Sequence, residues 1–176
     1  YVFGSESYEA NKESIDSINK SVYEKNDPAI NALYTTGRKE SLEHFEEIYK
    51  ILGTKFDHYF FEGTEGLEGV PLVKAFLEKG VFETSDGAVV FKGEKYGLHT
   101  RVFLTAKGLP TYETKELGLN KAKFEKEPDL GLSIIITANE QSEYFRVVLK
   151  AMEFVLPDIA AKTKHISHGM MQLTSG

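Results

Sequence analysis

The sequence predicts an α/β domain, and three features indicate it. A nearly continuous apolar run, "LSIIITA" at residues 132–138, is followed by an amphipathic stretch and a second strand-like segment. This order is typical of a parallel sheet that is covered on both faces. Turn residues between apolar runs predict β-hairpins upstream, and the start of the chain has helical spacing instead. We therefore expect residues 1–55 to be mainly helical and residues 56–176 to be α/β.

The N-terminal part is predicted to contain two helices. Residues 5–25 are polar, with sparse apolar side chains at the spacings of a surface helix. Asp27 and Pro28 suit the cap and the first helical position of the next helix. That helix is expected to end at Gly53. Its apolar stripe comprises Leu42, Phe45, Ile48, Tyr49 and Leu52.

The middle of the chain predicts a strand, a loop and a short helix. The segment "KFDHYFFE" at residues 55–62 is rich in aromatic residues, which favour strands. The glycines that follow, at positions 63, 66 and 69, predict a loop, and "PLVKAFLEKG" predicts a helix that Gly80 ends.

Two hairpins and three further elements are predicted beyond Gly80. The pairs Asp86-Gly87 and Lys107-Gly108 suit the tight turns of the hairpins. Residues 114–126 and 141–156 have helical period, and residues 164–173 predict the last strand.

The composition restricts the class of protein. The chain has no cysteine, which excludes disulfides and cysteine-ligated metals and favours a reducing compartment, so we expect a cytoplasmic protein. Its apolar runs are far shorter than the roughly 20 residues that span a membrane. The net charge is −6, with lysines and arginines interleaved among acids, which argues against this chain gripping nucleic acid by itself.

Polar side chains just after the predicted parallel strands are candidate binding residues, because ligands of open parallel sheets lie at the carboxyl ends of the strands. These are Glu62 after the aromatic segment, and Asn139, Glu140 and Gln141 after "LSIIITA". Asn139 also suits a helix cap. Position alone therefore favours a structural role for this second group.

Tyr112 and Glu116 lie four residues apart in "LPTYETKELGL", which places them on one side of a helix. A carboxylate beside a phenol could hold a planar guanidinium through paired hydrogen bonds and a ring contact. The alternative, which spacing alone favours, is a core tyrosine and an acid that interacts with the helix dipole.

The histidines do not predict a metal site. His165 and His168 have an odd separation in a predicted strand, which points their side chains to opposite faces. The chain also lacks a phosphate-binding loop, a nucleophile elbow and a metalloprotease motif.

Several collinear segments resemble the catalytic domain of arginyl-tRNA synthetases, class I enzymes with a Rossmann-like core. The segments are "YVFGSESYE", "GRKESLEHFEEIYKILGTKFDHYFFEG", "SDGAVVF", "GLPTYETKELGL", "ITANEQSEYF" and "HISHGMM". They cover nearly the whole chain in the family's order. The resemblance implies an internal fragment of the catalytic domain, with a Rossmann-like parallel sheet and helical and β-hairpin insertions.

The resemblance also implies roles for particular residues. Those that match the family's arginine-binding positions are Glu62, Tyr112, Glu116 and Gln141. Those that match the segment bordering the ATP adenine are His165, Gly169 and Met170. Three positions depart from the family: Glu116 stands where Asp is usual, Tyr144 where His is common, and His168 where an aromatic residue is common.

The implied activity is ATP-dependent activation of L-arginine and its transfer to tRNA(Arg) by the complete enzyme, with Mg²⁺ assisting at the phosphates. The family's His-x-Gly-His-like and Lys-Met-Ser-like signatures are not in this sequence. We therefore expect no catalytic residue and no metal ligand in the chain, and no arginine activation by the chain alone. A monomer is expected.

Two alternatives stay open at this point. One is a non-catalytic arginine- or nucleotide-binding module of the same fold, and the other is a different class I synthetase. Tyr112 with acids at positions 62 and 116 favours a cationic substrate over the aliphatic ones that some class I members take.

Overall fold

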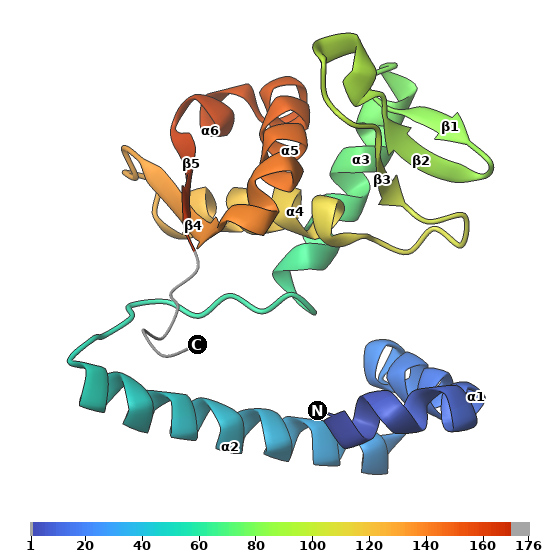
Figure 1. The fold of residues 1–176 in the computed structure, drawn as a ribbon, viewed down its shortest axis with the longest axis vertical. Coiled ribbons are helices and arrows are strands. Elements are labelled where there is room, and N and C mark those ends of the chain that lie inside the picture. Colours follow the sequence, from blue (N-terminus) through green and yellow to red (C-terminus); the bar gives the residue numbers. More distant parts are fainter. Residues whose placement is uncertain (1, 170–176) are drawn as a thin grey trace. The chain divides into compact units, whose positions relative to one another are not determined.

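The computed structural model describes residues 2–169, and the chain divides into two compact units, Tyr1–Tyr59 and Phe60–Gly176 (Figure 1). All buried hydrophobic side chains among the described residues belong to the second unit. No helix within this described part is long and apolar enough to cross a membrane.

The first unit consists of the helices α1 (Val2–Glu24) and α2 (Pro28–Leu52). The predicted boundaries of α2 are confirmed. The Asp27 carboxylate accepts hydrogen bonds from the backbone N–H groups of Ala29 and Ile30 at 2.9 and 3.1 Å, and Gly53 ends the helix with a left-handed φ of 67°. Neither helix has a buried residue.

The aromatic segment at residues 55–62 was predicted to be a strand, and this prediction is wrong. The segment is an irregular connection that ends in a turn. A strand needs a neighbour to satisfy its backbone N–H and C=O groups, and no described strand pairs with these residues.

The predicted glycine loop is partly helical. The short helix η1 (Glu65–Glu68) leads directly into α3 (Gly69–Glu78), so Gly66 and Gly69 lie within helical turns. The predicted helix stop is confirmed, since Gly80 has a φ of 76°.

A three-stranded antiparallel sheet follows, in the order β1 (Glu83–Ser85), β2 (Ala88–Phe91), β3 (Arg101–Leu104). The turn between β1 and β2 is the predicted one, with positive φ at Asp86 and Gly87. The helix η2 (Gly93–Tyr96) lies between β2 and β3. The second predicted hairpin is reduced to a single bridge between Leu104 and Pro110, since proline cannot donate a ladder hydrogen bond.

The last part contains a parallel strand pair. The elements are β4 (Ser133–Ala138), η3 (Asn139–Gln141), α5 (Ser142–Val155), α6 (Pro157–Ala161) and β5 (Thr163–His168). β4 and β5 pair from Ser133 opposite Thr163 to Ala138 opposite His168.

The α/β class is thus confirmed, but the expectation that both faces of the parallel sheet are covered is wrong for this chain. The side chains of Ile134, Ile136 and Ile166 are 48, 66 and 50% exposed. Only two parallel strands are present among the described residues, and these three side chains are left about half exposed or more.

The helix α4 (Tyr112–Lys126) packs against α3 and α5 and contributes Leu117 to the core of the second unit (Figure 1). The backbone of α4 lies very close to the backbone of η1 and of the first residue of α3. A Cβ atom at Gly69 would lie 1.9 Å from the Thr114 carbonyl oxygen, and one at Gly118 would lie 2.3 Å from that of Glu65. These glycines therefore hold residues 62–69 tightly against α4.

Candidate functional site

A cavity of about 190 Å³ in the second unit contains most of the predicted arginine-binding residues. Its lining consists of Phe60, Phe61, Glu62, Glu65, Gly66, Tyr112, Lys115, Glu116, Leu119 and Tyr144. Glu62 comes from the connection before η1, Tyr112 and Glu116 come from α4, and Tyr144 comes from α5. The fourth predicted residue, Gln141, is not part of the lining.

The start of α4 is tied to β3, which positions Tyr112. The Thr111 hydroxyl donates to the carbonyl oxygens of Val102 and Phe103 at 2.7 and 3.0 Å. Tyr112 is the first residue of the helix and its side chain is 70% exposed. The alternative reading of Tyr112 as a core residue is therefore wrong.

Glu116 is a partly buried carboxylate at the wall of the cavity. Burial raises the pKa of Glu116 above its ordinary value, while the charge of Lys123 and a hydrogen bond from Asn120 oppose the rise. That bond joins the Asn120 side-chain nitrogen to Glu116 Oε1 at 3.0 Å. Burial lowers the pKa of Lys123, which the charge of Glu116 opposes. Neighbouring groups on α4 thus favour the charged form of Glu116, and burial disfavours it.

Asn120 orients this carboxylate. Its side chain is fully buried and also donates to the backbone oxygen of Glu116 at 2.9 Å. Asn120 is not among the predicted site residues, since an asparagine in a helix has no distinguishing pattern until its burial is known.

The side chain of Lys115 contributes a positive charge to the lining of the cavity. Its ammonium group binds the carboxylate of Glu62 and lies 5.4 Å from the centre of the Tyr112 ring. The Lys115 side chain is only 16% exposed, against 50% for Glu62. Lys115 is not among the predicted site residues either, because Glu62 and Lys115 are far apart in the chain.

Tyr144 closes another side of the cavity. Burial and the negative charges of Glu116, Glu113 and Glu62 raise the pKa of Tyr144 well above its ordinary value, with Arg101 opposing. The hydroxyl therefore stays protonated at neutral pH. The Arg101 guanidinium lies 5.7 Å from the centre of the Tyr144 ring and 3.4 Å from the carboxylate of Glu113.

The remaining predicted site residues lie near the carboxyl ends of the parallel strands. Gln141 is exposed at the end of η3, one helical turn before Tyr144. A Cβ atom at Gly169, just past β5, would lie 4.0 Å from the side-chain nitrogen of Asn139. The two strand ends are therefore adjacent. Met170 lies outside the described residues.

His165 lies in β5 against α5. Its ring stacks on Phe145 with centres 4.4 Å apart and planes at 17°, and its Nε2 is 2.8 Å from the Thr137 hydroxyl. Burial lowers the pKa of His165, so the ring is neutral at physiological pH. The side chain presents a flat, uncharged surface.

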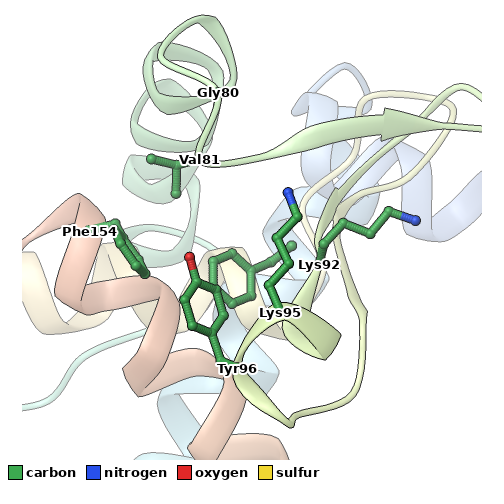
Figure 2. A pocket seen from close by; sticks show the side chains of 7 residues that line it. Gly80, Val81, Lys92, Lys95, Tyr96 and Phe154 are labelled. Carbon is green, nitrogen blue, oxygen red and sulfur yellow. The ribbon is translucent and has the colours of Figure 1, made fainter.

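A second cavity, of about 110 Å³, has no predicted site residue in its lining. Figure 2 shows the rings of Tyr96 and Phe154 together with the side chains of Lys92 and Lys95. Lys95 is already paired with Glu83. Among the residues that the structure describes, no group of three or more acidic or histidine side chains is arranged to hold a metal ion.

Comparison with solved structures shows which fold the chain resembles. The chain superposes on arginyl-tRNA synthetase from Plasmodium falciparum with a TM-score of 0.74 and 16% sequence identity, over 93% of this chain and 29% of that one. The fold of this chain is thus similar to that of part of this solved structure.

The chain is also similar to curated protein sequences. No family model matches the chain. It is 33% identical over 155 residues to the arginine–tRNA ligase of Flavobacterium psychrophilum and 31% identical over 155 residues to that of Parabacteroides distasonis. The chain is therefore similar, over most of its length, to a segment of these arginine–tRNA ligases. Each match covers 88% of this chain and 26% of the relative's length.

Proposed function

We propose that this chain forms the arginine-selecting part of the catalytic domain of an arginine–tRNA ligase. The complete enzyme would activate L-arginine with ATP and transfer it to tRNA(Arg). The observation that supports this proposal most is the single cavity lined by Glu62, Tyr112 and Glu116. These residues come from two distant parts of the chain.

The chemistry of the cavity suits a guanidinium group. A guanidinium is planar, always charged, and has five N–H donors that match carboxylate oxygens. Glu116 and Glu62 would accept these donors, and the exposed ring of Tyr112 would cover the cation. Citrulline has no charge to pair with the carboxylates, so the site would discriminate against it. Gln141, one turn before Tyr144, would contact the amino-acid end of the substrate.

The ends of the parallel strands are proposed to bind ATP. His165, Gly169 and Met170 would border the adenine, and the flat neutral ring of His165 suits such a surface. Ligands of open α/β sheets commonly bind at this edge. We propose that β4 and β5 belong to a Rossmann-like sheet of the complete protein, in which further strands extend the sheet and helices cover the exposed isoleucines. Mg²⁺ is expected with ATP, although no group of three or more acidic or histidine side chains among the described residues is arranged to hold it.

The proposed role of the chain is selection and positioning of substrate, with no catalytic residue of its own. All of residues 1–176 would be part of the catalytic domain of a monomeric, cytoplasmic enzyme. We expect the purified chain alone to show no arginine-dependent exchange of pyrophosphate into ATP. Measurable exchange would contradict the proposal that the chain selects and positions substrate but has no catalytic residue. If the complete protein binds arginine but also lacks exchange, it is instead a non-catalytic module.

The decisive test is Glu116→Ala in the complete enzyme. Loss of a charged hydrogen-bond partner typically costs about 1.5–3 kcal/mol, or roughly a 10- to 100-fold rise in the KM for arginine. Steady-state pyrophosphate exchange measures this, with the KM for ATP as internal reference. Glu125→Ala is the matched control, because Glu125 lies on the same helix, pairs with Lys121 and is not part of the cavity lining. An unchanged arginine requirement in Glu116→Ala would contradict the guanidinium role.

A further inference from the structure

We propose that Lys115 is an intramolecular occupant of the arginine site, which competes with the incoming guanidinium and lowers the affinity for any cationic ligand. The inference rests on the proposed function of the cavity. It adds a residue to which neither the family resemblance nor the spacing of the sequence gives a role.

The contacts of Lys115 are those expected of the ligand. Its ammonium group binds Glu62 and lies over the ring of Tyr112. These are two of the three cavity groups proposed to hold the guanidinium. In the ligand-free protein both are already engaged by a cation, and arginine must displace it.

The backbone around Lys115 directs its side chain into the cavity. A Cβ atom at Gly66 would lie 2.7 Å from Lys115 Cγ and 2.9 Å from its Cβ. The aliphatic stem of Lys115 therefore packs directly against the Gly66 backbone, in space that any larger residue would fill. This packing explains why Lys115 is 16% exposed, although surface lysines usually extend into water.

Another lysine of α4 provides a contrast. Lys121 pairs with Glu68 at 3.3 Å and with Glu125 at 2.7 Å, and it does not line the cavity. Its side chain is 28% exposed. Lys121 therefore belongs to a similar ion pair, which joins α4 to Glu68 of η1, while Lys115 pairs with Glu62 just before η1. Lys121 does not line the site. It is the matched control for Lys115.

The competition has a quantitative signature. Breaking the Lys115–Glu62 pair costs the same whichever cationic ligand enters, so removal of Lys115 should improve the binding of arginine and of lysine by one common factor. Partly exposed ion pairs of this kind correspond to about a two- to fivefold effect on affinity. The ratio of the two affinities should stay unchanged.

The experiment measures arginine binding to the complete protein by calorimetry. We expect Lys115→Met to lower the Kd for arginine about two- to fivefold, and Lys115→Arg to raise it, because an arginine side chain offers Glu62 a better-matched donor pair. Lys121→Met should leave the Kd unchanged. Lysine, measured by displacement of arginine, should gain from Lys115→Met by the same factor as arginine.

The possible failures are distinguishable. If Glu116→Ala binds arginine as well as the wild type does, the proposed site itself is wrong. If Glu116→Ala weakens binding while Lys115→Met leaves it unchanged or weakens it, only the competition is overturned. If Lys115→Met weakens binding, Lys115 would contact the substrate directly.

A second measurement uses the unmodified protein and does not depend on the folding of a variant. Arginine should release the Lys115 ammonium from Glu62 and so increase its acetylation by a lysine-selective reagent, as followed by peptide mass spectrometry. The acetylation of Lys121 provides the reference. Protection of Lys115 by arginine would overturn the proposal.

Discussion

At the scale of single residues, Glu116 combines burial with a role that requires charge. Burial raises the pKa of its carboxyl group, so Glu116 takes up a proton at higher pH than an exposed glutamate does. Only the charged form would pair with a guanidinium. The affinity of the site for arginine therefore depends on the protonation of this residue.

The expected result is a loss of arginine affinity on acidification. As the pH falls through the raised pKa of Glu116, the carboxylate is neutralised, and below that pKa the Kd should rise by up to about tenfold per pH unit. Calorimetric titration of the complete protein from about pH 8 to about pH 5 would measure this.

Glu116→Gln is the control for the pH effect, since it has nearly the same shape and cannot titrate. Its arginine affinity should be weak and nearly flat over the same pH range. A pH dependence in Glu116→Gln equal to that of the wild type would assign the effect to another group.

At the scale of elements, Gly118 fixes the distance between α4 and the segment that contains Glu62. In an exposed helix, Gly→Ala is stabilising by up to about 1 kcal/mol. At Gly118 the new Cβ atom would lie 2.3 Å from the Glu65 carbonyl oxygen and 2.7 Å from the Gly69 nitrogen. Both are backbone atoms, so relief requires the two elements to separate.

We therefore expect Gly118→Ala to lower the free energy of unfolding by about 1–3 kcal/mol. Gly37→Ala is the matched control, because Gly37 also lies inside a helix, α2, and a Cβ atom there meets nothing within 4 Å. That variant should be stabilised or unchanged. Denaturant unfolding of the chain gives both values, and equal effects of the two substitutions would contradict the close approach of η1 to α4.

At the scale of the whole molecule, the division into two units makes a prediction about proteolysis. Residues 54–61 contain no helix or strand, and the boundary between the units falls after Tyr59. Limited digestion with chymotrypsin should cleave first at the aromatic residues of this segment, Phe56 and Tyr59 among them.

The C-terminal product should stay folded, since every buried hydrophobic residue of the described chain belongs to it. Mass spectrometry identifies the first cut, and circular dichroism follows the unfolding of the product. A first cut within α4 or within the three-stranded sheet would contradict the assignment of the units.

Sequence patterns of neighbouring residues were sufficient to predict much of the fold. The ends of α2 follow from Asp27, Pro28 and Gly53, and the first hairpin turn follows from Asp86-Gly87. Caps and tight turns depend on neighbouring residues only, so a single sequence reveals them. The spacing of Tyr112 and Glu116 likewise determines that both lie on one side of α4. Their role in arginine binding came from the family resemblance and stays a proposal.

Only the tertiary structure decided the remaining features. The aromatic residues 55–62 have strand propensity but no strand partner, and a strand exists only by pairing. The Lys115–Glu62 ion pair joins residues far apart in the chain, and Gly66, Gly69 and Gly118 matter because of the backbone atoms they approach. The sequence by itself determined the helical periods, the helix caps and the hairpin turns, because each of these depends only on residues close together in the chain. Which side chains meet in the cavity depends on contacts between distant segments, and only the folded chain forms them.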